Sequence, residues 1–106
     1  MHVLLINGSP HKKGCTYTAL SLVAGELNAA GITTEILNVG TKPVGGCIGC
    51  GGCAKGNGCV FGGVVNEAIE KARTADAFVF GTPVHYASAS GNMTSFMDRL
   101  AYAGGK

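Results

Sequence analysis

Two short, uninterrupted apolar runs constrain the fold of this chain more than any other feature. They cover Val3 to Ile6 and Ala77 to Phe80, and each has the length of a strand. A continuous apolar run of this length is typical of a strand that is buried on both faces of a parallel sheet. Around Thr34 to Asn38 the sequence alternates between polar and apolar residues and contains β-branched residues. This pattern predicts another strand between the two apolar runs.

The segments between the predicted strands have helical periodicity. From about Thr16 to Ala30 apolar residues recur at helical spacing, and Gly31 follows where a helix C-cap is expected. The same pattern predicts helices from Val64 to Ala75 and from Ser90 to Tyr102. The chain is therefore an α/β protein of the order β-α-β-loop-α-β-loop-α. If the strand order is 2-1-3, the loops after the first and third strands lie side by side at the switch point, where open parallel sheets bind ligands.

Composition excludes several classes of protein. The 106 residues suffice for one domain, residues 1–106, and 46% hydrophobic with only 13% charged residues exclude a disordered chain. The net charge of +2 with one basic cluster, His11 to Lys13, favours a single phosphate group over a nucleic-acid surface. No basic segment precedes the first apolar run, so we predict a strand there and not a signal peptide. We expect a cytoplasmic protein that binds neither nucleic acid nor membranes.

The loop after the first predicted strand has the chemistry of a phosphate cradle. Residues 8–16 lead from a strand into a helix, whose free N–H groups and positive dipole end attract an anion. Ser9 and Thr16 supply hydroxyl groups, and His11 and Lys12 offset the charge. The loop is neither a Walker A loop nor a GxGxxG fingerprint, and it suits a mononucleotide such as FMN. The alternative is an ordinary loop that ends in a Ser or Thr cap.

The loop after the third predicted strand offers a flat surface. Pro83 stiffens this loop, and His85 and Tyr86 carry planar rings that suit stacking on, or edging, a planar ligand. Ser88 belongs to the turn into the next helix. The alternative is that Tyr86 packs on the neighbouring helix and that His85 is an exposed loop residue.

Several short motifs occur in these two loops in a fixed order. They are Asn7-Gly8-Ser9-Pro10 followed by Gly14, then Thr82-Pro83-Val84-His85-Tyr86, and then Gly91, Asn92, Phe96, Asp98 and Arg99. Together they resemble the NADPH-dependent FMN reductase family of flavodoxin-like proteins. The resemblance implies a flavodoxin-like three-layer parallel sheet with FMN as cofactor. Carried over position by position, it places the FMN phosphate at Ser9, His11, Cys15 and Thr16, and the ring and ribityl chain at Pro83, Val84, His85, Tyr86 and Ser88. Relatives often carry Arg at the position of His11 and Asn at that of Cys15.

Four of the five cysteines fall within one glycine-rich segment, Gly40 to Gly63. Cys47, Cys50, Cys53 and Cys59 form the spacing C-x2-C-x2-C-x5-C, which lets thiolates of one loop converge on one metal group. This pattern resembles the iron–sulfur flavoproteins, a branch of the same family, and so implies a [4Fe–4S] cluster near the FMN. A zinc site and a loop of free thiols without metal are the alternatives.

The resemblance implies a flavin-dependent oxidoreductase or electron carrier, with NAD(P)H or a redox protein as electron donor. No catalytic acid or base is required, and we nominate none. The alternatives are a non-enzymatic metal or redox-sensing module and an inactive fragment of the flavoprotein fold. Flavodoxin-like sheets have five strands and this chain supplies three, so we expect a C-terminally truncated domain. The edge of the third strand, or the helix from Met93 to Leu100, is then expected to be covered by another chain in a homo-oligomer.

Overall fold

The computed structural model describes residues 1–11, 13–42, 44–56, 58–84 and 88–104. Three strands, β1 (His2–Asn7), β2 (Thr33–Asn38) and β3 (Ala77–Gly81), form a parallel sheet in the order β2-β1-β3. This confirms the α/β fold and the 2-1-3 strand order. The register pairs Leu5 of β1 with Ile36 of β2 and Val79 of β3. The central strand is β1, whose apolar run is completely buried.

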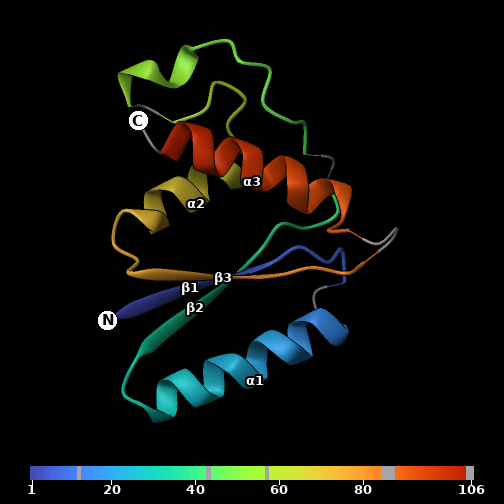
Figure 1. The fold of residues 1–106 in the computed structure, drawn as a ribbon, viewed down its shortest axis with the longest axis vertical. Coiled ribbons are helices and arrows are strands. Elements are labelled where there is room, and N and C mark those ends of the chain that lie inside the picture. Colours follow the sequence, from blue (N-terminus) through green and yellow to red (C-terminus); the bar gives the residue numbers. More distant parts are fainter. Residues whose placement is uncertain (12, 43, 57, 85–87, 105–106) are drawn as a thin grey trace.

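Helices cover both faces of the sheet. Helix α1 (Cys15–Ala29) lies on one face, and α2 (Val64–Ala72) and α3 (Gly91–Gly104) lie on the other (Figure 1). Alternate residues of β1 therefore enter two separate cores. Val3 and Leu5 pack with Leu20 and Ala24 of α1. The other core lies toward α2 and α3 and contains Leu4, Ile6, Val65, Ile69, Met93, Phe96 and Leu100.

The helix boundaries differ slightly from the sequence expectation. Gly31 follows the C-cap residue Ala30 of α1 and has a φ of +83°, as expected for the glycine that ends a helix. Helix α2 ends at Ala72 and not at Ala75, because the N–H groups of Arg73 and Thr74 bond to carbonyls only three residues back. Helix α3 begins at Gly91, and Ser90 caps it by accepting the Met93 N–H on its hydroxyl at 3.2 Å.

The prediction that the third strand is buried on both faces is wrong for this chain. Phe78 and Phe80 are each 40% exposed, and their rings stack with centroids 6.1 Å apart. The physical reason is that β3 is the edge of the sheet. Val79 points toward α1, whereas the two phenylalanines lie beside an apolar groove that they share with Met97 and Leu100 of α3.

The segment from Gly40 to Gly63, called the cysteine loop below, runs over the outer side of α2 and α3 (Figure 1). It contains a short 3-10 helix, η1 (Gly52–Lys55), that the sequence did not predict. Gly51 and Gly56 flank η1 with φ values of +76° and +79°, which only glycine adopts at little cost. None of the helices within the described ranges is long and apolar enough to cross a membrane.

Candidate functional site

The loops after β1 and β3 meet at the carboxyl edge of the sheet. The Gly8 N–H donates to the Gly81 carbonyl at 2.8 Å, and the Ser90 hydroxyl lies 3.5 Å from the Gly8 carbonyl oxygen. The approach leaves no space for a side chain on Gly8, since a Cβ there would lie 2.6 Å from Met93 Cε and 3.2 Å from the Gly81 oxygen. The adjacency that the 2-1-3 order predicted is therefore a direct backbone contact.

Polar side chains shape the first loop from inside. Asn7 is fully buried; its Oδ1 accepts the Ser9 N–H at 3.0 Å and its Nδ2 donates to Asn38 Oδ1 at 3.0 Å. The Ser9 hydroxyl in turn accepts the His11 N–H at 3.1 Å. Ser9 is itself buried, so in this conformation its hydroxyl organises the turn, while the His11 side chain is exposed. Lys12 lies outside the described residues.

The start of α1 has the properties of an anion site. Gly14 occupies the N-cap position, and within the described ranges no side chain caps the first N–H groups. The first turn carries no acidic residue, so the positive end of the helix dipole is not offset. Exposed Cys15 and half-buried Thr16 line one pocket with Gly81 and Thr82 from the other loop. These features fit a phosphate group held by backbone and hydroxyl donors.

A hydrogen-bonded turn follows β3. The Thr82 hydroxyl oxygen accepts the Ser90 N–H at 3.1 Å, and Val84 pairs with Ala89 in an antiparallel bridge. Of the predicted ring-binding residues, Pro83 is half-buried and Val84 and Ser88 are exposed at the site. His85 and Tyr86 fall outside the described residues.

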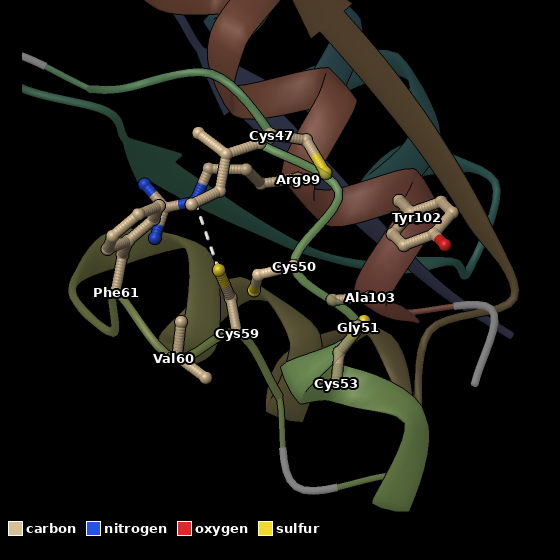
Figure 2. Close-up of a pocket in the computed structure, with 11 residues that line it drawn as sticks. Cys47, Cys50, Gly51, Cys53, Cys59, Val60, Phe61, Arg99, Tyr102 and Ala103 are labelled. Atoms are coloured by element: carbon tan, nitrogen blue, oxygen red, sulfur yellow. Dashed lines mark hydrogen bonds between the residues drawn. The ribbon is translucent and has the colours of Figure 1, made fainter.

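The four loop cysteines gather around a second site. Cys47, Cys50, Cys53 and Cys59 all line one pocket against the C-terminal half of α3 (Figure 2). Their environments differ: Cys53 is packed in the core, Cys59 is half-buried, and Cys47 and Cys50 are exposed. The chemistry of four thiols around one pocket fits a soft metal group. In this conformation, no three metal-binding side chains of the described residues lie within reach of one ion.

Arg99 is the buried cation of this second site, with only 6% of its surface exposed. Its Nε donates to Cys59 Sγ at 3.3 Å, Nη1 to the Gly45 carbonyl at 3.4 Å and Nη2 to the Gly62 carbonyl at 3.0 Å. Its guanidinium lies 5.3 Å from the centroid of the Phe61 ring (Figure 2). None of the ion pairs found within the described ranges involves Arg99. A buried cation without a carboxylate partner favours an anion beside it, and the Cys59 sulfur occupies that place.

The pKa of the Cys59 thiol is lowered accordingly. Burial raises this pKa, but hydrogen bonds from the Phe61 backbone and the Arg99 side chain, together with the Arg99 charge, lower it by more. The surroundings of Cys59 thus favour its thiolate form.

Helix α3 connects the two sites. Its N-terminus, capped by Ser90, borders the two joined loops, and Arg99 reaches the cysteine loop. Nine residues of helix span about 14 Å along the axis, so both sites are fixed to one short rigid element.

Sequence reasoning did not assign the residues that organise these sites. Asn7 and Arg99 belong to the family motifs but received no role, and Asn66 had no signal at all. Arg99 could have been found, because it follows Phe96 by three residues and therefore lies on the apolar side of the helix that Met93 and Phe96 mark. A charged residue on a core-facing stripe requires a partner, and the nearby cysteine loop offers one.

Comparison with known proteins agrees with this architecture. The family profile described as NADPH-dependent FMN reductase matches residues 1–106. An iron-sulfur flavoprotein of Archaeoglobus fulgidus is 34% identical over 103 residues, which are 97% of this chain and 50% of that protein. An iron-sulfur flavoprotein of Methanocaldococcus jannaschii is 31% identical over 99 residues, which are 93% of this chain and 51% of that protein. The chain therefore spans about half the length of these relatives.

Proposed function

Because this chain belongs to the NADPH-dependent FMN reductase family, we propose that it is a flavoprotein that binds FMN at the carboxyl ends of β1 and β3. The observation that carries the proposal is the 2.8 Å hydrogen bond from Gly8 N–H to the Gly81 carbonyl, which joins the two loops into one surface. Ligands of open parallel sheets bind at such a place. The uncapped start of α1 supports a phosphate at one end of this surface.

Each loop is proposed to hold one part of the cofactor. The first loop would hold the phosphate through the N–H groups at the start of α1 and the Thr16 hydroxyl, with Ser9 shaping the turn. The ring and ribityl chain would lie along the loop after β3. The full set of proposed FMN-binding residues is Ser9, His11, Lys12, Cys15, Thr16, Pro83, Val84, His85, Tyr86 and Ser88.

FMN, when bound, supplies the redox chemistry, by taking a hydride from a nicotinamide cofactor or single electrons from a redox protein. The chain's own part is to bind and orient the flavin and to shield one side of it. We therefore propose an oxidoreductase or electron-transfer role, with NAD(P)H or a redox protein as the partner. The cysteines within the described ranges are free thiols, which is compatible with the reducing cytoplasm, the compartment that we propose for this protein.

FMN binding is testable by titration of the purified chain while the quenching of flavin fluorescence is followed. Wild-type protein is expected to quench the flavin fluorescence and to bind one FMN per chain. Thr16→Val removes a hydroxyl donor to a charged phosphate, worth about 1.5–3 kcal/mol, so affinity is expected to fall roughly 10–100-fold. Thr74→Val is the matched control, because Thr74 lies just beyond α2, where its exposed hydroxyl donates to the Lys71 carbonyl. A wild-type chain that leaves FMN fluorescence unchanged would refute the proposal.

A second candidate function is that the cysteine loop carries a [4Fe–4S] cluster. Four thiols that line one pocket support it, as do relatives named as iron-sulfur flavoproteins. Anaerobic incubation with iron and sulfide is expected to give a brown protein with a broad visible absorption shoulder. Uptake of zinc alone would favour a zinc site, and retention of four free thiols would favour a loop without metal. A colourless chain that binds neither FMN nor iron would favour an inactive fragment.

We also propose that a second copy of this chain covers the edge of β3. The stacked pair Phe78 and Phe80, with the groove toward Met97 and Leu100, leaves apolar surface beside an edge of β3 that pairs with no described strand. Small-angle scattering over a range of concentrations tests this proposal. A stable monomer at all concentrations would contradict it.

A further inference from the structure

The first end of the cysteine loop is fastened to α3. Asn92 uses its whole amide group there: Oδ1 accepts the Val44 N–H at 3.1 Å, and Nδ2 donates to the Lys42 carbonyl at 3.2 Å. About two turns further along the helix, Arg99 donates to the Gly45 carbonyl at 3.4 Å. Lys42, Val44 and Gly45 are thus held by side chains of one helix.

The second end of the loop is fastened more strongly, and at one residue in particular. The Asn66 side chain of α2 binds both backbone groups of Cys59, accepting its N–H at 2.7 Å and donating to its carbonyl at 2.9 Å. Arg99 binds the Cys59 sulfur at 3.3 Å and the Gly62 carbonyl at 3.0 Å. A Cβ on Gly58 would lie 2.8 Å from Asn66 Oδ1, so the chain beside Cys59 approaches this amide as closely as glycine allows. Cys59 is therefore fixed to two helices, through its backbone to α2 and through its sulfur to α3.

Within the described ranges, neither Asn66 nor Asn92 nor Arg99 makes a hydrogen bond to the middle of the loop. Cys47 and Cys50 are exposed, and the hydrogen bond described between them, from Gly49 N–H to Cys47 Sγ at 3.4 Å, stays within the segment. Gly49 and Gly51 have positive φ values, so the segment turns at residues that adopt several backbone conformations at little cost. We call residues 46–51 the arm. Cys53 lies in η1, two residues after the end of the arm, and is packed in the core.

We propose that Asn66 and Arg99 are positioning residues that fix Cys59 as the anchor of the cysteine site, and that the arm closes on Cys53 and Cys59 when the thiols bind a metal group. This inference rests on the proposed role of the loop as a metal site. It accounts for two observations together: four cysteines line one pocket, yet no three of the described side chains lie within reach of one ion. Each thiol that binds releases its proton to water, and no oxidant is needed for a divalent ion.

Amide hydrogen exchange of the whole chain, in reductant and chelator, tests the anchor without any metal. The Cys59 amide is expected to exchange more slowly than amides of the arm, because Asn66 accepts its N–H. Asn66→Ala and Arg99→Gln are expected to accelerate exchange at residues 58–62 and to leave β1 unchanged. Arg73→Gln is the matched control, since Arg73 also donates to a loop carbonyl, that of Gly56 at 3.3 Å, but does not contact Cys59.

Titration with Co²⁺, followed by its thiolate charge-transfer absorption, tests the closure. Residues that orient metal ligands are typically worth 10–100-fold in affinity, so Asn66→Ala and Arg99→Gln are each expected to weaken Co²⁺ binding by about that factor. Arg99→Lys keeps one donor and the charge and is expected to recover part of the loss. Exchange in the arm is expected to slow when Co²⁺ is bound.

The outcomes separate this inference from the function on which it rests. A Cys59 amide that exchanges as fast as the arm overturns the anchor, and so does unchanged Co²⁺ affinity in both folded variants. If Co²⁺ does not slow amide hydrogen exchange in the arm, the proposed closure is overturned. If wild-type protein shows the protected Cys59 and the Co²⁺ response but takes up no iron and sulfide, the cluster proposal fails and the anchor stands.

Discussion

Gly8→Ala should destabilise the chain, because it places a methyl group where the first loop meets the third. The new Cβ would lie 2.6 Å from Met93 Cε, 3.0 Å from Met93 Cβ and 3.2 Å from the Gly81 oxygen. Carbon atoms normally approach to about 3.5–4.0 Å, so the closest contact is short by about 1 Å. Met93 Cε ends a flexible side chain, but Met93 Cβ and the Gly81 oxygen are fixed by the backbone of α3 and β3, so these two contacts cannot be relieved by a rotamer change.

Overpacking of this kind costs about 1–3 kcal/mol. For a domain of this size each kcal/mol lowers the unfolding midpoint by roughly 4–8 °C. Thermal and urea unfolding, followed by far-UV circular dichroism at one protein concentration, measure the change. Since the same contact joins the two loops, Gly8→Ala should also weaken FMN binding in the fluorescence titration.

Gly25→Ala is the matched control, and its expected change in stability has the opposite sign. Gly25 lies within α1, and a Cβ there would meet nothing within 4 Å. Alanine is favoured over glycine inside a helix by about 0.8–1.0 kcal/mol, so this variant should be more stable than wild type. The reasoning is refuted if Gly8→Ala unfolds at the wild-type midpoint with an unchanged urea dependence, because the crowding at Gly8 would then carry no cost.

Three further predictions follow from other parts of the molecule. Phe96→Ala removes a fully buried ring from the core under α3 and should lower the free energy of unfolding by about 3–5 kcal/mol in urea titration; a loss below 1 kcal/mol would contradict this assignment. The lowered pKa of Cys59 predicts that iodoacetamide labelling of Cys59, mapped by mass spectrometry in chelator and reductant, reaches its half-maximal rate at a lower pH in wild type than in Arg99→Gln. If the pH profiles of labelling coincide in the two proteins, Arg99 does not act on Cys59. The thiolate also adds stability to the folded state, which is fully present above the ordinary thiol pKa and is lost as the pH falls through the lowered pKa of Cys59. Phe78→Lys and Phe80→Lys each add a charge to the exposed edge of β3 and should shift scattering toward the monomer, whereas association that is unchanged would place the contact elsewhere.

The order of the elements followed from sequence because it depends on local pattern. The apolar run from Val3 to Ile6 is buried on both faces by α1 on one side and by α2 and α3 on the other, as a continuous run predicts. The glycine-rich turns were likewise visible as residue types at fixed places. The sequence left open whether a Ser or Thr caps the first helix, and the structure shows Gly14 at that position with no side-chain cap among the described residues. The same reasoning failed for Phe78 and Phe80, because the burial of a strand depends on which neighbour lies beside it, and an apolar run does not contain that information.

Only the tertiary structure decided how the sites are organised. Cysteine spacing predicted four thiols around one centre, and the fold does bring them to one pocket. It also separates Cys53 and Cys59, held by the core and the helices, from exposed Cys47 and Cys50. This division arises from contacts between residues distant in sequence, such as Arg99 with Cys59, 40 positions apart. Periodicity reports which face of an element is apolar, but only packing determines which side chain of one element meets which atom of another.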